Sequence, residues 1–137
     1  MDMEAVTVFS GILRDSQQEI EITDLVSFRS HDASGSFSLQ ARHLDFLTQT
    51  ESGLSQLSQK DGVLYMAATP GLLEMDGGRL YFSTRRMFLH EDPDLIQQQL
   101  TQWLEEERIN RKSSHVHLKQ LESELMQRLS RAHEPLR

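Results

Sequence analysis

Apolar and polar residues alternate in short segments along the N-terminal part of the chain. In residues 19–23 the isoleucines fall on one side and the polar residues on the other, as in a half-buried strand. Residues 6–9 and 25–28 are β-branched or aromatic runs of strand length. The pattern ends near residue 90. We therefore expect residues 1–90 to form a domain of their own, an antiparallel β-sandwich or flattened barrel.

Glycine-containing turns separate several of these segments. Asp61-Gly62 and Asp76-Gly77-Gly78 each lie between two apolar runs, and Pro70-Gly71 marks a further turn. Because glycine tolerates the positive φ that tight hairpins need, the first two positions predict β-hairpins.

The spacing of apolar residues becomes helical after Asp92-Pro93. Asp92 can cap a helix, and Pro93 at the first helical position loses no hydrogen bond that a helix would use. A first helix is expected to run to about Lys112, and Ser113 or Ser114 can cap a second. Residues 91–137 are thus predicted to form a C-terminal antiparallel two-helix hairpin after the mainly β domain.

Such a hairpin buries too few apolar side chains to be firmly stable alone, since ordering its residues carries a large entropic cost. It needs a second surface, either its own sandwich or a partner. Two available surfaces would make it suitable as a switch.

Charge and composition exclude several classes of function. The chain has 137 residues, a formal net charge of −7 and no cysteine. The acidic balance opposes binding to nucleic acid, and the lack of cysteine excludes disulfides. The sequence has no apolar run of the roughly 20 residues that a membrane span requires, and no signal peptide. We expect a soluble intracellular protein that reaches membranes only through partners, without direct insertion.

The candidate chemical groups do not form a recognisable site. His115 and His117 would point in different directions on a helix, so they cannot share a metal ion. His43 and Asp45 pair a base with a carboxylate, but no nucleophile-elbow pattern accompanies them. Gly35 belongs to a segment too poor in glycine to hold a phosphate. The sequence therefore predicts no catalytic residue, no cofactor and no metal, and points to a binding protein.

The order of the segments resembles the epsilon subunit of F-type ATP synthases. Residues 32–39 read Asp-Ala-Ser-Gly-Ser-Phe-Ser-Leu, and residues 42–48 read Arg-His-Leu-Asp-Phe-Leu-Thr. In that family an acidic turn, a Gly and Phe-Gly-Ile lead into Pro-x-His and Leu-Thr. Residues 71–75, Gly-Leu-Leu-Glu-Met, are similar to the family's Gly-Ile-Leu-Glu-Val. The resemblance covers roughly residues 24–104.

Three positions depart from the family's pattern. Ser38 stands where the family has Gly, and Ala41 and Ser52 stand where it has Pro. The Arg-His-x-Asp-Phe version resembles the alternate F-type ATPases that often occur as a second operon, some of which are linked to sodium pumping.

The resemblance implies a non-catalytic subunit of the central stalk. In the family the sandwich binds the gamma subunit and rests on the c-ring, transmitting torque, and the hairpin can reach the catalytic alpha/beta hexamer and block ATP hydrolysis. The complex lies on the cytoplasmic, inner face of the cell membrane, with protons or sodium ions as the translocated species.

The resemblance also implies positions for the interfaces. The turn that faces the c-ring would contain Asp32, Ser34, Gly35 and Ser36. The region that faces gamma would contain His43, Asp45, Phe46 and Thr48. The hairpin cations that could meet acidic catalytic subunits are Arg108, Arg111, Lys112, Arg128 and Arg131.

Two other functions are compatible with the residues. One is a free-standing β-sandwich protein-interaction module with a dimerising helical hairpin, which would not copurify with a rotary ATPase. The other is a small hydrolase that uses His43 and Asp45, which a substrate screen with a His43→Ala control would detect.

We predict that the isolated chain does not bind ATP. Some epsilon subunits bind ATP through Ile or Leu, Asp, two variable residues and Arg-Ala at the start of the first helix. Here Asp94 is kept, but Gln97 and Gln98 replace the Arg and the Ala. Loss of a charge-assisted contact to phosphate weakens binding by roughly one to two decades.

Calorimetric titration with millimolar ATP and magnesium should therefore show no saturable heat. A low-micromolar dissociation constant that Asp94→Ala abolishes would contradict this prediction.

Overall fold

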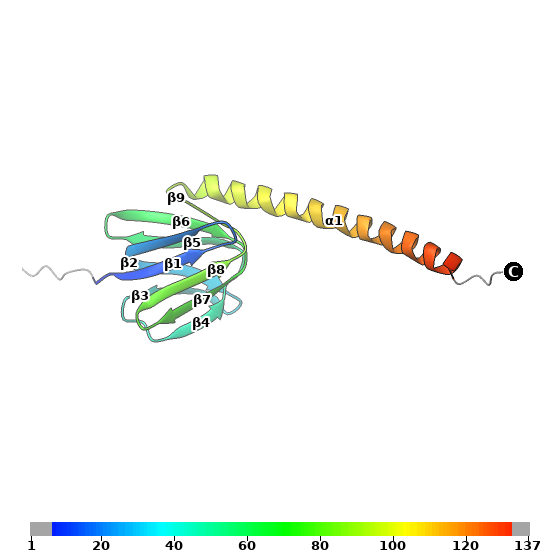
Figure 1. Ribbon diagram of the computed structural model, residues 1–137. Helices are drawn as coiled ribbons and strands as arrows, with labels where there is room; N and C mark the ends of the chain where they lie inside the picture. The colour runs from blue at the N-terminus through cyan, green and yellow to red at the C-terminus, as the bar shows by residue number, and fades with distance from the viewer. Residues whose placement is uncertain (1–6, 133–137) are drawn as a thin grey trace, which may run out of the picture. The chain divides into compact units, whose positions relative to one another are not determined.

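Nine strands and one long helix make up the part of the chain that the computed structural model describes, residues 7–132, without the side chains of 114–116 and 130–132 (Figure 1). The elements are β1 (Phe9–Arg14), β2 (Glu19–Asp32), β3 (Gly35–Gln40), β4 (Phe46–Gln49), β5 (Gly53–Gln59), β6 (Gly62–Ala68), β7 (Gly71–Asp76), β8 (Arg79–Thr84), β9 (Met87–His90) and α1 (Pro93–Ala132). The predicted fold class, a mainly β domain followed by a helical segment, is confirmed.

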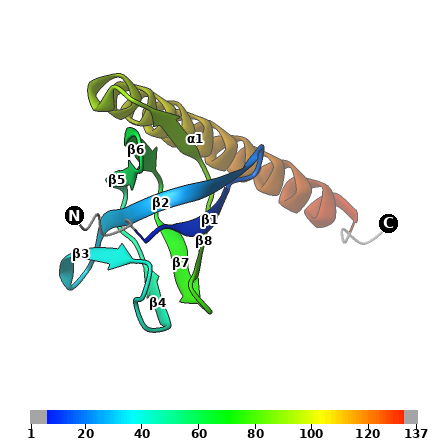
Figure 2. The same cartoon turned by 90° about the vertical axis from the view of Figure 1, so that its left-hand side faces the viewer.

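The strands form one nine-stranded sheet in the order β4-β7-β8-β1-β2-β5-β6-β9, with β3 paired to β2. All pairings are antiparallel except that of β1 with β8, which is parallel. The long strand β2 pairs with β1 along its first half and with β3 along its second half. The sheet folds into two layers around a common core (Figure 2).

The core consists of the inward-facing residues of both layers. Leu13, Leu25, Phe28, Leu57 and Leu80 have no exposed surface. Along β1, β5 and β8 the buried residues alternate with partly exposed ones, because successive side chains of a strand point to opposite faces. On β2 the alternation is interrupted between Leu25 and Phe28, where the pairing with β5 shifts its register. The period-two pattern of the sequence is thus the pattern of this core.

The predicted hairpins are present. β5 and β6 are joined by Lys60 and Asp61, with Gly62 as the first residue of β6 and without a positive φ, and β7 and β8 are joined by Gly77 and Gly78. The φ angles of Gly77 and Gly78 are 59° and 79°, as a two-residue turn with both central residues in the left-handed region requires. These glycines therefore fix the register of the β7–β8 hairpin.

The first turns of α1 cover one outer face of the sheet. Ile96 and Leu100 are buried, and they pack against Ala67 together with Tyr65 and Phe88. These residues lie on β6 and β9. The compact unit that contains the sheet consequently extends to Thr101, and a second unit begins at Gln102.

The prediction of a turn between two C-terminal helices is wrong. α1 continues as one helix through Ser113 and Ser114, where the sequence suggested a break. Residues 94–132 contain neither glycine nor proline. Serine in a helix interior costs only a few tenths of a kcal/mol more than the best helix formers, so nothing in this segment forces a turn.

A buried carboxylate holds the β1–β2 turn against the β8–β9 connection. The side chain of Asp15 has no exposed surface. It accepts hydrogen bonds from the backbone N–H groups of Gln17, Gln18 and Met87 at 2.8, 3.0 and 3.0 Å. The guanidinium of Arg86 lies 3.5 Å away and stacks over Phe88, 4.6 Å from the ring centroid. Asp15 therefore joins segments that are far apart in the sequence.

Asp15 should make stability depend on pH. Burial raises its pKa, but the hydrogen bonds from Gln17, Met87 and Gln18 outweigh burial and hold the pKa below its usual value. A group whose pKa is lowered by folding stabilises above its unfolded pKa, and this contribution is lost as the pH falls through the folded pKa. Asp15→Asn should lower the free energy of unfolding by about 1–3 kcal/mol at pH 7.

Denaturant titration at several pH values checks this. The difference between wild type and Asp15→Asn should shrink as the pH falls from 5 toward 3, whereas the exposed Asp76→Asn should have little effect at any pH. A difference that stays constant across this range would contradict the account.

Truncation of α1 should show how much its first turns contribute to the stability of the sheet, separately from the rest of the helix. A chain that ends at residue 104 keeps Ile96 and Leu100, and a chain that ends at residue 90 loses both. Burial of each side chain is worth about 1.5–3 kcal/mol. We expect both fragments to unfold cooperatively, with the shorter one less stable by about 3–6 kcal/mol. Equal stability, measured by denaturant unfolding, would show that the first turns of α1 do not stabilise the sheet.

Candidate interaction surfaces

The outer face formed by β4, β7, β8 and β1 is not covered by any described part of the compact unit that ends at Thr101. We call it the open face. The strand register places Leu47, Glu74, Tyr81 and Ile12 side by side across it. A second row contains Gln49, Leu72, Ser83 and Arg14. The open face therefore has apolar residues along its middle and charged residues among them.

Three leucines on or beside the open face are strongly exposed. Leu47 on β4 and Leu72 on β7 are 62% and 54% exposed, and Leu44 in the preceding loop is 83% exposed. An exposed leucine gains free energy when a partner covers it, and a cluster with a polar surround is typical of protein-binding surfaces. Leu47 and Leu72 therefore form an exposed apolar part of the open face.

Acidic side chains lie beside Leu47. A shallow depression of about 360 Å³ lies beside Leu47 and is lined by Phe46, Met75 and three carboxylate side chains. These acids are Asp45, Glu74 and Asp76. The carboxylate of Asp45 accepts a hydrogen bond from the N–H of Gly77 at 3.2 Å, which ties the loop before β4 to the β7–β8 turn.

Two of the residues predicted to face gamma point inward instead. Phe46 is half-buried and its ring centroid lies 5.4 Å from that of Phe37. Thr48 is also half-buried, and its hydroxyl donates to Asp32 at 2.7 Å. His43 and Asp45 are exposed, with His43 edge-on to Phe46 at 5.8 Å.

Sequence reasoning missed Leu44, Leu47 and Leu72. The alternation along β4 could have found Leu47, because it stands between two residues of the inward-facing set.

The turn predicted to face the c-ring is the β2–β3 turn. Asp32 accepts hydrogen bonds from the N–H and the hydroxyl of Ser34 at 2.9 and 2.5 Å. Together with Thr48, Ser34 lowers the pKa of Asp32. Ser34, Gly35 and Ser36 are exposed. The structure thus brings together Asp32 and Thr48, which the sequence assigned to different interfaces.

Asp32 also closes the sheet. Its backbone forms an isolated antiparallel bridge with Thr50, which follows β4. The N–H of Thr50 donates a hydrogen bond to the carbonyl oxygen of Gly71 at 2.8 Å, and the N–H of Gly71 donates to the hydroxyl of Thr50 at 3.1 Å. The carboxylate of Asp32 thus accepts hydrogen bonds from residues of the same chain, Ser34 and Thr48. The exposed part of the turn consists of small residues.

The second unit of the chain is the part of α1 after Thr101. Leu118, Leu121, Leu125 and Leu129 are 58%, 48%, 58% and 48% exposed, at helical spacing. In proteins most helical stability comes from packing of an apolar face against other parts of the structure. A partner that covered this stripe of leucines would stabilise the helix.

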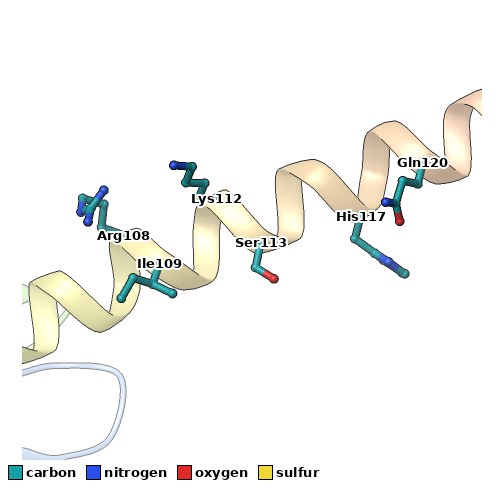
Figure 3. Close-up of a pocket in the computed structure, with 6 residues that line it drawn as sticks. All are labelled: Arg108, Ile109, Lys112, Ser113, His117 and Gln120. Carbon is teal, nitrogen blue, oxygen red and sulfur yellow. The ribbon is translucent and has the colours of Figure 1, made fainter.

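Figure 3 shows the middle of α1, where Arg108 and Lys112 project from one side, and Ile109, Ser113 and His117 from the other. All of these residues come from one helix, so they enclose nothing and form an exposed surface rather than a ligand site.

The cations predicted to meet the catalytic subunits differ in whether the described part of the chain gives them an acidic partner. Arg108 donates to Glu105 at 2.7 and 3.2 Å, and this hydrogen bond with its charge attraction raises the pKa of Arg108 and lowers that of Glu105. Arg111, Lys112 and Arg128 are exposed. The side chain of Arg131 lies outside the described residues.

Neither a metal centre nor a membrane-spanning helix is found in the described part of the chain. Within residues 7–132, apart from the undescribed side chains, no three His, Asp or Glu residues are placed to hold a metal ion. Among the same residues no helix is long and apolar enough to cross a membrane.

A curated relative supports the resemblance found in the sequence. Over 62 residues the chain is 39% identical to the ATP synthase epsilon chain 2 of Cereibacter sphaeroides. This segment covers 44% of the chain and 42% of the relative, so the match spans less than half of either protein. The resemblance to epsilon subunits is confirmed at this level. No model of a known protein family matches the chain.

Two solved structures share the fold. A chain in the structure of the central stalk and c-ring of the Tetrahymena thermophila mitochondrial ATP synthase matches 58% of this chain and 64% of its own length, with a TM-score of 0.52 and 13% identity. A chain in the Euglena gracilis mitochondrial ATP synthase, solved with OSCP, F1 and c-ring, matches 79% of this chain and 68% of its own, with a TM-score of 0.58 and 15% identity. At these identities the likeness concerns the fold.

Proposed function

We propose that this protein is a non-catalytic central-stalk subunit of an F-type ATP synthase, in the position of the epsilon subunit. The observation that carries the proposal is an exposed apolar sheet face in a chain that is 39% identical to an epsilon chain over 62 residues. A domain that exposes large leucines in this way is built to be covered by a partner. No catalytic residue, metal or cofactor forms part of the proposal.

The open face is the proposed contact with the gamma subunit. Leu44, Leu47 and Leu72 would supply the apolar part, and Asp45 and Glu74 would meet basic residues of the partner. Complementary charges steer association, whereas buried apolar side chains near the centre of an interface supply most of the affinity. This proposal keeps His43 and Asp45 as gamma-facing residues and gives Phe46 and Thr48 the role of supporting the strand from inside.

The β2–β3 turn is the proposed contact with the c-ring. Its exposed residues Ser34, Gly35 and Ser36 are small, so a second backbone can approach closely. The bonds of Asp32 to Ser34 and Thr48 would hold the turn in shape while it transmits torque.

The distal part of α1 is the proposed contact with the catalytic alpha/beta hexamer. Its exposed leucines need a partner, and Arg111, Lys112 and Arg128 could meet acidic groups there. Binding of this helix within the hexamer would inhibit ATP hydrolysis by obstructing rotation. The subunit would act at the inner, cytoplasmic face of the cell membrane as a peripheral part of the complex.

The leucine stripe also favours a second function. The sandwich could be a free-standing interaction module whose helix pairs with a second copy through Leu118, Leu121, Leu125 and Leu129. This function predicts a concentration-dependent dimer and no association with a rotary ATPase.

We predict that replacing the leucines of the open face abolishes binding to gamma without unfolding the protein. Each leucine buried in an interface is worth about 1.5–3 kcal/mol, so Leu47→Ser with Leu72→Ser should weaken binding by at least two decades. Because both side chains are more than half exposed, the free energy of unfolding should change by no more than about 0.5 kcal/mol.

Titration with the purified gamma subunit from the same organism measures the binding. Leu118→Ser is the matched control, since it removes an equally exposed leucine from α1. Undiminished binding of the Leu47 and Leu72 double variant would exclude the open face as the gamma contact. Failure of the wild-type chain to bind gamma at all would contradict the proposed function.

A further inference from the structure

The joint between the β-sandwich and α1 contains a hydrogen bond that requires a neutral histidine. The backbone N–H of Asp92 donates to Nδ1 of His90 at 2.9 Å. His90 is the last residue of β9, and Asp92 directly precedes the first residue of α1. A histidine nitrogen accepts a hydrogen bond only while it carries no proton, so this bond exists only in the neutral imidazole.

The same aspartate caps the helix. Its side-chain oxygen Oδ1 accepts from the N–H of Asp94 at 3.0 Å, as an N-cap residue does. In a capping box, a Glu or Gln at the third helical position would bond back to the N–H of the cap residue. Here that position is Leu95, which has no polar group. His90 takes over this task from the preceding strand.

The helix that depends on this cap is the element that packs on the sheet. Ile96 and Leu100, in the first turns after the cap, are buried against Ala67. β9 itself is an edge strand that pairs only with β6 among the described strands. The joint is therefore held by the cap, by a short ladder and by a small apolar cluster, without a larger layer over it.

We propose that protonation of His90 releases the cap of α1 and loosens the first turns of the helix from the sandwich, so that the joint responds to pH. Histidine is the side chain that ordinarily changes charge between about pH 5 and 8. In the imidazolium both ring nitrogens are donors, so the N–H of Asp92 loses its acceptor. The cation also attracts the carboxylate of Asp92 away from the N–H of Asp94.

The charged and titratable groups around His90 support this competition. Glu91 and Asp92 adjoin it in the connection, Asp94 lies in the first turn of α1, and the phenol of Tyr65 lies beside it on β6. Residues 91–95 and the strands β6 and β9 contain carboxylates and no Lys or Arg, and the nearby cation Arg86, which precedes β9, lies over the ring of Phe88 and within 3.5 Å of Asp15. A protonated His90 therefore has anionic partners that hold it in the released arrangement. The proposal does not depend on which partner the protein binds.

The test uses the full chain and compares wild type with His90→Asn. The amide oxygen of asparagine can accept the same hydrogen bond but does not titrate in this range, so the variant keeps the cap at every pH. His90→Phe, which has no acceptor, provides the released reference. Nuclear magnetic resonance at pH 8 and pH 5 reports the amide protons of Asp92 and Asp94, and hydrogen exchange reports the amides from Gln97 onward.

In wild type we expect both amide protons to move upfield on acidification, and exchange from Gln97 onward, corrected for its intrinsic pH dependence, to become about fivefold faster, the effect of losing one hydrogen bond. His90→Asn should show neither change, and His90→Phe should resemble acidified wild type at pH 8. The same acid response in His90→Asn and in wild type would assign it to other groups and overturn the proposal. So would an unchanged Asp92 amide in wild type.

Discussion

The pairing of β1 on both of its edges is the constraint on which the rest of the structure depends. β1 pairs antiparallel with β2 and parallel with β8, so it connects the strands that follow it directly with those that come much later in the chain. Asp15, at its end, then fixes the β8–β9 connection. With this strand in place one outer face of the sheet receives the first turns of α1, and no described residue up to Thr101 covers the open face.

Two apolar surfaces are exposed in the described part of the chain. The open face exposes Leu47 and Leu72, and the distal part of α1 exposes a stripe of leucines. Large apolar side chains are costly to leave in water, and exposed clusters of them are typical of protein-binding surfaces. A stalk subunit that contacts gamma through its sandwich and the hexamer through its helix would cover both.

The sequence predicted those features that depend on local patterns. Alternation in residues 19–23, the Gly77-Gly78 turn and the cap at Asp92 follow from period, backbone freedom and side-chain chemistry, and the structure confirms each of them. The sequence did not predict those features that depend on contacts between residues far apart in the chain. The parallel β1–β8 pair, the bond from Thr48 to Asp32 and the inward position of Phe46 arise from tertiary packing. The absent turn at Ser113 shows that a residue able to cap a helix need not end the preceding one.

Site-specific photo-cross-linking in the assembled complex tests the central claim most directly. A photoreactive residue at position 72 would lie on the open face, and one at position 56 on β5 would lie on the opposite outer face, the side that α1 partly covers. We predict that membranes containing the rotary ATPase yield a cross-link to gamma from position 72 and little or none from position 56. A chain that does not copurify with the ATPase, or that cross-links to gamma only from position 56, would contradict the account.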